Sequence, residues 1–580
     1  MLDPAEKATL VAETLNSKYK IAGKEHNLYS DIVPSGHKQE DLCYPTFEMA
    51  LNVLENLRED SGTGPDMLPA RILKMCAKQL ARPIILLVTR MLCDGVWPDM
   101  WREHWIVPIF KRGSVFKPAN YRGIHMTAQL SKIVERLIKR MVEPYLEHSL
   151  ALGVNQFAYR AQRGARDALA FLTLQWMCAL NKRQKIVVYC SDVAGAFDRV
   201  SMERLIAKLY AKGVNEKLIR LFKSWLQTRR ARVAIGGEFS SETPLKDMVF
   251  QGTVVGPLLW LIFFQDASRA IIEAFFQDIV FADDLNAYRI YEETSPNTTL
   301  WRHAEQCQTN LHKWGTANQV SFDANKESFN IISRYVPEGP GFKLLGIFYD
   351  NALSMTKTVT KLHDDAMWKV RTLLRSRRFY DVKEMVTSYK AKVLSYLEYR
   401  TAAIYHAATT LLQLVDKIQD RFLSEMGISE LDALTDFHLS PLSARRDMGM
   451  LGLIHRTVIG YGPDHFKQFF VKEDATRIRE RHSTKRHDFQ LRTYRTGQYL
   501  DMMRNSALGL IDIYNLLPIY VVGAPTVKLF QRRLQELLKH FAKSGHSGWQ
   551  TVYSPRNTIF HHTLRNFSSW VPATGGGLDS

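Results

Sequence analysis

The stretch that most constrains the fold is VFADDLNAYR, which spans Val280–Arg289. An apolar run ends in two adjacent aspartates, Asp283 and Asp284, and an alternating segment follows them. This order predicts a strand, a tight turn and a second strand, with a carboxylate pair at the tip of the hairpin. Taken alone, such a pair is more often an exposed turn, because Asp is a favoured turn residue. Two carboxylates this close repel each other, and Mg²⁺ is a cation that prefers their oxygens.

A second acidic stretch, KIVVYCSDVAGAFDRV, spans Lys185–Val200. Its β-branched run predicts a buried strand that ends at Asp192. Acids at the ends of buried strands are typical of two-metal phosphoryl-transfer sites. We predict that Asp198, the other acid of the stretch, caps or pairs with the following helix, and we leave it out of the catalytic set.

A third stretch, FQGTVVGPLLW, spans Phe250–Trp260. Its Gly252 and Gly256 permit close approach of the backbone to a ligand, and Gln251 places an amide at the start of the loop. With these three stretches in order, the chain resembles a reverse transcriptase of the LINE type (non-LTR retrotransposon), in particular the jockey-like elements. The resemblance extends from about residue 61 to at least residue 470.

This resemblance implies an α+β fold, a right-hand polymerase with fingers, a palm built on a small antiparallel sheet, and a helical thumb. It implies an N-terminal extension at 1–40, fingers with N-terminal helices at 41–184, a palm at 185–350, a helical thumb at 351–480 and a basic, helical C-terminal region at 481–580. In that last region the helix Pro525–Lys543 is expected to turn Phe530, Leu534 and Phe541 inward. Its cationic face fits a solvated surface and an RNA contact about equally.

The resemblance also implies the site residues. Asp192, Asp283 and Asp284 would bind two Mg²⁺ ions, with Mn²⁺ as a substitute, and act in catalysis with Lys326. The incoming dNTP would be contacted by Lys111, Arg122, Phe197, Gln251 and Gly252. Without the motif, the cations Lys111, Arg122 and Lys326 would be interpreted as ordinary solvated side chains. Phe197 has two interpretations, as a ring beneath the incoming sugar or as a core aromatic.

The implied function is an RNA-directed DNA polymerase of a non-LTR retrotransposon, copying an RNA template into DNA by two-metal nucleotidyl transfer. Its partners would be the RNA template, a DNA primer or target, and dNTPs. Two alternatives stay open. One is a catalytically retired RNA-binding product of a degenerate retroelement, and the other is an RNA-templated RNA polymerase.

The composition favours a polyanionic partner. The 580 residues carry a formal net charge of +18, which suits nucleic acid first and an anionic membrane second. The six cysteines are scattered without a CxxC pair, which argues against a disulfide framework or a zinc knuckle. No membrane-spanning apolar run and no signal peptide are recognised. We therefore expect an intracellular protein, in the nucleus for DNA synthesis and in the cytoplasm for translation and RNA binding.

Overall fold

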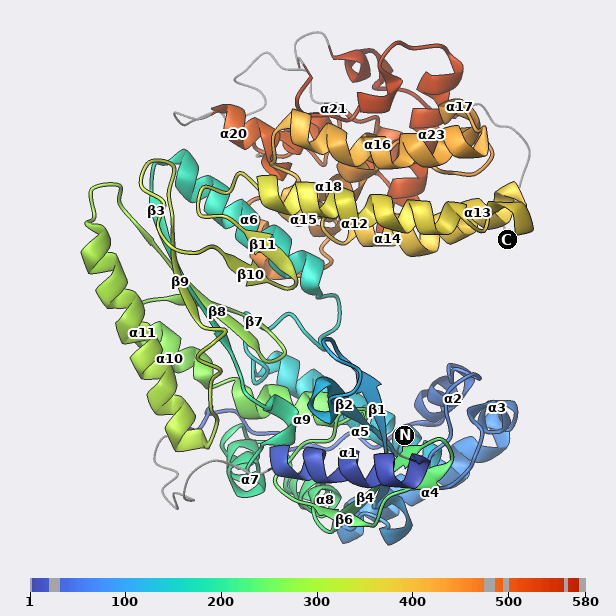
Figure 1. The fold of residues 1–580 in the computed structure, drawn as a ribbon, viewed down its shortest axis with the longest axis vertical. Helices are drawn as coiled ribbons and strands as arrows, with labels where there is room; N and C mark the ends of the chain where they lie inside the picture. The colour runs from blue at the N-terminus through green and yellow to red at the C-terminus, as the bar shows by residue number, and fades with distance from the viewer. Residues whose placement is uncertain (1–2, 20–31, 474–485, 494–499, 558–561, 573–580) are drawn as a thin grey trace. The chain divides into compact units, whose positions relative to one another are not determined.

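The computed structural model describes residues 3–19, 32–473, 486–493, 500–557 and 562–572 (Figure 1). Parts of the predicted C-terminal region, 481–485, 494–499, 558–561 and 573–580, lie outside the described residues. The described chain is a mixture of helices and sheets, which confirms the predicted mixed α and β class. It divides into unit 1, with residues 1–159, 189–287 and 302–327, and unit 2, with residues 160–188, 288–301 and 328–580.

Two sheets organise the strands. In the first, of order β2-β1-β4-β5, β1 (Glu103–Phe110) pairs antiparallel with β2 (Tyr121–Met126) and parallel with β4 (Arg229–Ile235). Two short strands, β5 (Glu238–Phe239) and β6 (Thr243–Leu245), both pair with β4. β1 and β2 thus flank the basic loop 111–120, and β4 and β5 form a hairpin that turns at Gly236-Gly237.

The second sheet holds the acidic stretches and has the order β7-β8-β3-β9. Its strands are β7 (Gln277–Phe281), β8 (Asp284–Tyr291), β3 (Lys185–Asp192) and β9 (Ser328–Ile332). Because β3 and β8 are neighbours, the strand that ends at Asp192 lies beside the strand that begins at Asp284. The chain passes from one unit to the other within these two strands and within α11 (Asn297–Asn318).

The helices of unit 1 follow the apolar spacing of the sequence. They are α1 (Pro4–Lys18), α2 (Phe47–Glu55), α3 (Ala70–Met75), α4 (Ala77–Asp94), α5 (Gln129–His148), α7 (Met202–Ala211), α8 (Glu216–Leu226), α9 (Gly256–Phe264) and α10 (Ala267–Glu273). α5 shows the clearest pattern, since Ile133, Leu137 and Met141 recur on one face and are 0%, 0% and 4% exposed. α9 is apolar on every side, and the seven residues Leu258–Phe264 are all buried, so α9 lies in the core beneath the second sheet's turn.

Unit 2 holds β9, parts of β3 and β8 and one small hairpin, and its other described elements are helices. The hairpin strands are β10 (Phe342–Leu344) and β11 (Ile347–Tyr349). The helices are α6 (Ala165–Asn181), α12 (Thr356–Leu374), α13 (Val382–Tyr389), α14 (Ser395–Glu398), α15 (Thr401–Ile404), α16 (Thr409–Met426), α17 (Glu430–Thr435), α18 (Leu442–Val458), α20 (Leu500–Asn505), α21 (Leu510–Leu516), α22 (Ile519–Val522) and α23 (Val527–Lys543). A π-helical turn, Lys390–Leu394, joins α13 to α14.

α23 confirms the helix predicted at Pro525–Lys543. Thr526 caps it by accepting a hydrogen bond from the backbone N–H of Leu529 at 3.2 Å. Phe530, Leu534 and Phe541 are each 0% exposed, as expected for the inward face.

None of the helices that the structure describes is both long enough and apolar enough to cross a membrane.

Candidate active site

The turn between β7 and β8 carries the aspartate pair. β7 ends at Phe281 and β8 begins at Asp284, so Ala282 and Asp283 form a two-residue turn. The predicted hairpin is thus confirmed. Ala282 has a φ of +61°, in the left-handed region, which is unfavourable for a residue with a Cβ atom. Such a conformation costs about 1–3 kcal/mol and persists only where the surroundings hold it.

Two side chains hold this turn. Gln156 Oε1 accepts a hydrogen bond from the Ala282 N–H at 2.9 Å, and its Nε2 donates to the Ala282 carbonyl at 3.4 Å. The indole N–H of Trp260 donates to the same carbonyl at 3.1 Å. Both polar groups of the strained residue are therefore bonded to buried side chains, since Gln156 is 5% exposed and Trp260 is 0% exposed.

Gln156 is itself fixed by backbone pairing beside β7. The Val280 N–H donates to the Asn155 carbonyl at 3.0 Å, and the Phe157 N–H donates to the Val280 carbonyl at 2.9 Å. These two bonds form a short parallel bridge between Gln156 and Val280. The Gln156 amide that holds the turn is therefore positioned by β7, the strand that leads into the same turn.

Asp192 lies at the end of β3, next to the start of β8. The Ser191 hydroxyl donates to the Leu285 carbonyl at 2.9 Å, which ties the two strand ends together. Lys326 forms an ion pair with Asp192 and a second one, at 3.2 Å, with Asp323. The Asp323 N–H donates to the Asp192 carbonyl at 2.9 Å, so the loop that carries Lys326 is anchored on the strand end.

The electrostatics bring Asp283 into the same neighbourhood. Burial raises the pKa of Asp283, and the nearby charge of Asp192 raises it further, while Arg122 and Lys326 oppose the shift. A raised pKa means that the folded protein disfavours the charged carboxylate. A bound cation would relieve that cost.

The donor set fits a hard divalent cation, because it consists of carboxylate oxygens. Asp284 stands beside Asp283 in the chain, and the Asn286 amide donates to it at 2.8 Å. In the part of the chain that the structure describes, no three His, Cys, Asp or Glu side chains are gathered closely enough to hold a metal ion as they stand. The ion pair with Lys326 instead neutralises Asp192.

Two predicted cations lie near the acidic residues, since the charge of Arg122 acts on Asp283 and that of Lys111 acts on Asp198. Lys111 follows the end of β1, and Arg122 lies on the neighbouring β2. Both are exposed, and neither forms a side-chain hydrogen bond or ion pair with a described residue. Partial burial of the Lys111 ammonium lowers its pKa, and the neighbouring charges of Arg122 and Lys18 lower it further. The mutual repulsion of these cations would be relieved by an anionic ligand.

Asp198 does not cap the following helix, which is one of the two roles predicted for it. The cap of α7 is Ser201, whose hydroxyl accepts from the Arg204 N–H at 3.4 Å, because Asp198 ends a separate 3₁₀ turn, Ala196–Asp198. Burial raises the pKa of Asp198 to about 6, against the attraction of Lys111, Lys18 and Arg122. The carboxyl therefore lies among the cations of the site.

Phe197 is 6% exposed and lies in a stack of aromatic rings. Its ring is stacked on Trp260 with a centroid distance of 5.5 Å and meets the edge of Tyr159 at 6.2 Å. Trp260 also holds the Ala282 turn, and the charge of Asp283 acts on Tyr159. Phe197 thus contacts the rings that support the acidic turn, and its burial is compatible with both interpretations.

Gln251 and Gly252 lie against β2, as the N–H of His125 donates to the Gln251 carbonyl at 2.7 Å. Gly252 has a φ of +106°, and a Cβ atom there would lie 2.6 Å from the His125 carbonyl oxygen. At Gly256 a Cβ would lie 2.6 Å from the Thr253 hydroxyl oxygen. The expected close approach is thus made to the protein's own atoms, and glycine is required to seat the loop on β2.

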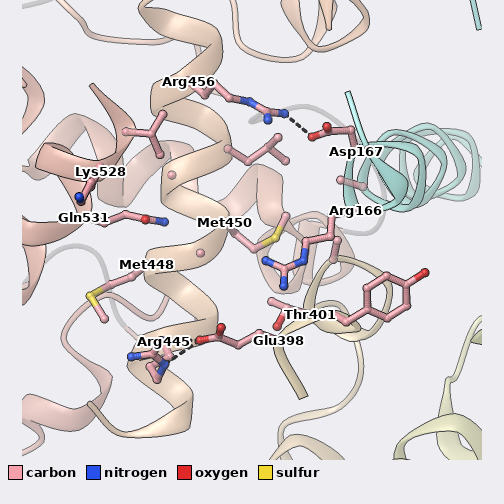
Figure 2. Close-up of a pocket in the computed structure, with 18 of the residues that line it drawn as sticks. Arg166, Asp167, Glu398, Thr401, Arg445, Met448, Met450, Arg456, Lys528 and Gln531 are labelled. Atoms are coloured by element: carbon pink, nitrogen blue, oxygen red, sulfur yellow. Dashed lines mark hydrogen bonds and ion pairs between the residues drawn. The ribbon is translucent and has the colours of Figure 1, made fainter. Parts of the chain in front are cut away.

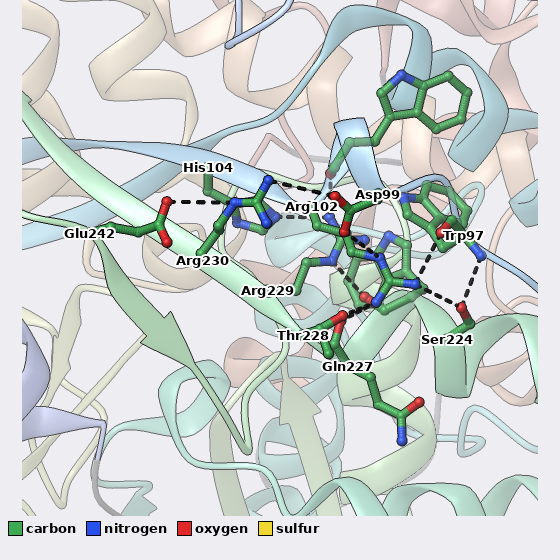
Figure 3. Close-up of polar contacts among 12 residues, drawn as sticks. Trp97, Asp99, Arg102, His104, Ser224, Gln227, Thr228, Arg229, Arg230 and Glu242 are labelled. Atoms are coloured by element: carbon green, nitrogen blue, oxygen red, sulfur yellow. Dashed lines mark hydrogen bonds and ion pairs between the residues drawn. The ribbon is translucent and has the colours of Figure 1, made fainter.

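A buried cluster of charged and imidazole side chains contacts this loop; this Arg229 cluster consists of Arg229, His104, His125 and Glu135. Figure 3 shows Arg229 and His104. Arg229 is 1% exposed. Its guanidinium donates to the carbonyls of Trp225 and Trp101 at 2.6 and 2.8 Å and to His104 Nε2 at 2.9 Å. The rings of Trp97, Trp225 and Phe250 surround it, with centroids 5.0–5.6 Å away.

The remaining members of the Arg229 cluster extend its hydrogen bonding to the neighbouring loop. A guanidinium only donates, so His104 Nε2 accepts and His104 Nδ1 donates to His125 Nδ1 at 3.0 Å. Burial lowers the pKa of His125 to about 3, so this ring is neutral at pH 7. Glu135, 0% exposed, accepts from the N–H groups of Val254 and Val255 at 2.7 and 3.1 Å. The cluster thereby fixes the loop that begins at Gln251.

Sequence reasoning missed Gln156, Trp260 and Asp198 as parts of this site. Asp198 had a signal, since it stands only six positions after Asp192 in the same acidic stretch. Trp260 belongs to a helix so apolar that its indole N–H gave no separate signal. Gln156 bonds a residue 126 positions away, and nothing in the local pattern reports such a contact.

Comparison with known proteins is consistent with this geometry. Residues 109–347 match the family described as "Reverse transcriptase (RNA-dependent DNA polymerase)". The chain is 25% identical over 450 residues to the RNA-directed DNA polymerase from mobile element jockey of Drosophila funebris. The matched region covers 73% of this chain and 46% of that protein.

Two further relatives come from Drosophila melanogaster. The RNA-directed DNA polymerase from mobile element jockey is 25% identical over 60% of this chain and 41% of its own length. The probable RNA-directed DNA polymerase from transposon X-element is 26% identical over 61% of this chain and 41% of its own length. The chain thus spans less than half the length of these curated relatives. Residues 109–347 thus match the reverse transcriptase family, and the chain is similar to jockey-type RNA-directed DNA polymerases of Drosophila mobile elements.

Proposed function

We propose that this chain is an RNA-directed DNA polymerase that copies an RNA template into DNA. The observation that carries the proposal is the meeting of two strand ends, which brings Asp192 near the Asp283-Asp284 turn. The charge of Arg122 acts both on Asp283 and on Lys111. Carboxylates that hold cations, together with side chains that neutralise a triphosphate, are the groups that nucleotidyl transfer needs. The reverse transcriptase domain and its relatives support the same reaction.

Asp192, Asp283 and Asp284 would hold two divalent cations, Mg²⁺ or Mn²⁺. Bound there, the cations would activate the primer hydroxyl and stabilise the charge on the transferring phosphorus. Lys111 and Arg122 would bind and orient the triphosphate of the dNTP, since no described partner occupies either side chain. Lys326 would protonate the leaving pyrophosphate, and its present pairing with Asp192 puts it within reach of the site.

The remaining positions would shape the substrate pocket. Gln251 and Gly252 would pack against the nascent base pair and template, on a loop that the Arg229 cluster fixes. Phe197 would lie beneath the sugar of the dNTP. We also propose the right-hand layout, with the fingers, palm, thumb and C-terminal boundaries given above, and activity in the nucleus after translation and RNA binding in the cytoplasm.

Primer extension on a defined RNA template tests this function. The purified chain should extend a DNA primer with dNTPs in Mg²⁺ and should fail to do so with rNTPs. Asp192→Asn serves as the inactive control and should still bind the template, because binding depends on Lys and Arg contacts to phosphates. Template binding without extension by the parent chain would overturn the proposal in favour of a retired RNA-binding protein. Extension with rNTPs would instead indicate an RNA polymerase.

A further inference from the structure

Unit 2 contains a groove that is separate from the acidic turn in sequence and composition. Its cavity volume is about 1420 Å³, and residues from α6, α14, α15, α18 and α23 line it (Figure 2). Small-molecule pockets typically enclose about 300–1,000 Å³. The groove is larger than that range, and its lining side chains Arg166, Lys528 and Arg532 are exposed to solvent. An extended ligand therefore fits it better than a compact one.

Two of the helices that line this groove, α18 and α23, meet at a close contact. On α18, a Cβ atom at Gly452 would lie 2.6 Å from Nε2 of Gln531 on α23, so glycine lets the polar face of α23 lie against α18. Figure 2 shows Gln531 and Arg166 on opposite sides of α18. Residues of α23 and of the start of α6 line the same cavity as residues of α18.

The groove is strongly basic. Seven of its lining residues are Arg or Lys and three are Asp or Glu. Two of the three acids are already neutralised, because Glu398 pairs with Arg445 at 2.6 Å and Asp167 pairs with Arg456. The third, Glu536, accepts a hydrogen bond from the Tyr520 hydroxyl at 3.3 Å.

Three of the cations have no partner within the described residues. No side-chain hydrogen bond or ion pair is formed there by Arg166, Lys528 or Arg532. Two acids of the groove are paired with other arginines instead. Lys528 and Arg532 are one helical turn apart on α23, so they lie on the same face about 6 Å apart along the axis. Arg166 reaches the groove from α6.

We propose that this groove binds the phosphate backbone of a single strand of nucleic acid, and that Arg166, Lys528 and Arg532 supply the contacts. Repeated, solvent-exposed cations suit a polymer with a charge on every residue, and Arg forks match phosphate oxygens. The amides of Gln531 and Gln535 add neutral donors beside them. This inference goes beyond the proposed function, because binding in the groove requires no polymerisation. It also favours the RNA-contacting interpretation of the basic helix Pro525–Lys543 over a merely solvated face.

Anisotropy titrations of the full chain, without dNTPs, test the groove. The probes are a fluorescent 20-nucleotide single-stranded RNA and the DNA strand of the same sequence. The test variant is Arg166→Glu/Lys528→Glu/Arg532→Glu. The control variant is Lys78→Glu/Lys223→Glu/Lys313→Glu, which makes the same charge change at exposed lysines of unit 1.

The test variant should bind at least about tenfold more weakly, and the slope of log K against log salt should fall by about 2, as expected for three lost single-strand phosphate contacts. The control should stay within about twofold of the parent. Equal loss with RNA and DNA would show recognition of the shared backbone, and loss with RNA alone would show recognition of the ribose strand. Both outcomes support the groove.

The proposal is overturned if the test variant keeps the parental melting temperature and also binds both strands with the parental affinity. It is equally overturned if the affinity of the test variant falls no more than that of the control variant. Displacement of RNA by polyglutamate at equal charge concentration would also overturn it, by showing an acidic-peptide site. A chain that binds RNA through the groove but fails to extend a primer would contradict the proposed function and leave this inference standing.

Discussion

The acidic turn and the Arg229 cluster handle charge in opposite ways, although both lie in unit 1. In the acidic turn the neutral backbone is held by Gln156 and Trp260, while burial and the neighbouring charge of Asp192 raise the pKa of Asp283. In the Arg229 cluster the charge itself is bonded, to two carbonyls and a neutral imidazole. Charge left unsatisfied is available to a ligand, whereas charge satisfied internally only holds the fold together.

Asp283→Asn tests the ligand-facing side of this comparison and should have the largest effect. Primer extension should fall by on the order of a thousandfold or more, because the substitution removes a charged ligand worth several kcal/mol to the transition state. Stability at pH 7 should stay level or rise. The raised pKa means that folding disfavours the charged carboxylate above its folded pKa, and Asn removes that charge. Initial rates and melting temperatures measure both, and extension at the parental rate would remove Asp283 from the site.

Arg229→Met tests the structural side. We expect a loss of about 3–5 kcal/mol in the free energy of unfolding, because Glu135 and two buried carbonyls lose their cationic partner. Arg230→Met is the matched control. Its side chain is 36% exposed and its ion pairs with Asp99 and Glu242 are 3.8 and 3.5 Å long, so its loss should stay below about 1 kcal/mol. Urea unfolding at pH 7 compares them, and equal losses would contradict the distinction.

Phe197→Val tests whether the Phe197 ring contacts the substrate or serves only in the core. If the ring lies beneath the incoming sugar, rNTP incorporation relative to dNTP should rise roughly ten- to hundred-fold, because a rigid ring cannot yield to a 2′-hydroxyl without about 1–3 kcal/mol of strain. Phe263→Val, at a position 0% exposed in the same ring stack, should lower the melting temperature without changing the ratio. An unchanged ratio in Phe197→Val, with a lowered melting point, would assign Phe197 to the core.

Gln156→Leu probes the neutral bonds of the acidic turn and should have the smallest effect. Extension should fall about tenfold, since two hydrogen bonds to Ala282 are lost at about 0.5–1.5 kcal/mol each. The Mg²⁺ concentration for half-maximal rate should rise, because the misplaced carboxylates hold cations less well. Trp260→Phe keeps the ring stack and loses one bond, so its effect should be smaller. A melting-point loss with unchanged Mg²⁺ dependence would mean that Gln156 acts on stability alone.

The local elements of both regions could be predicted from the sequence, and their assembly could not. Alternating residues around Asp283 and the β-branched run before Asp192 specify their strands without outside help. By contrast, Arg229 reads as one more exposed cation in a basic chain, because its burial depends on rings contributed by Trp97, Trp225 and Phe250. The N-cap predicted for Asp198 was wrong because a 3₁₀ turn intervenes and the hydroxyl of Ser201 lies closer to the helix.

The bond between Gln156 and the Ala282 turn has a consequence for how the chain assembles. The two residues are 126 positions apart, so the turn is supported only after a long loop has closed. During synthesis, Gln156 emerges well before its partner, and the strained alanine has no support until both are present. A fragment of residues 185–350 would contain all three aspartates yet lack the segment Asn155–Phe157 that braces them. The smallest fragment able to present the carboxylates in working order therefore begins before Asn155.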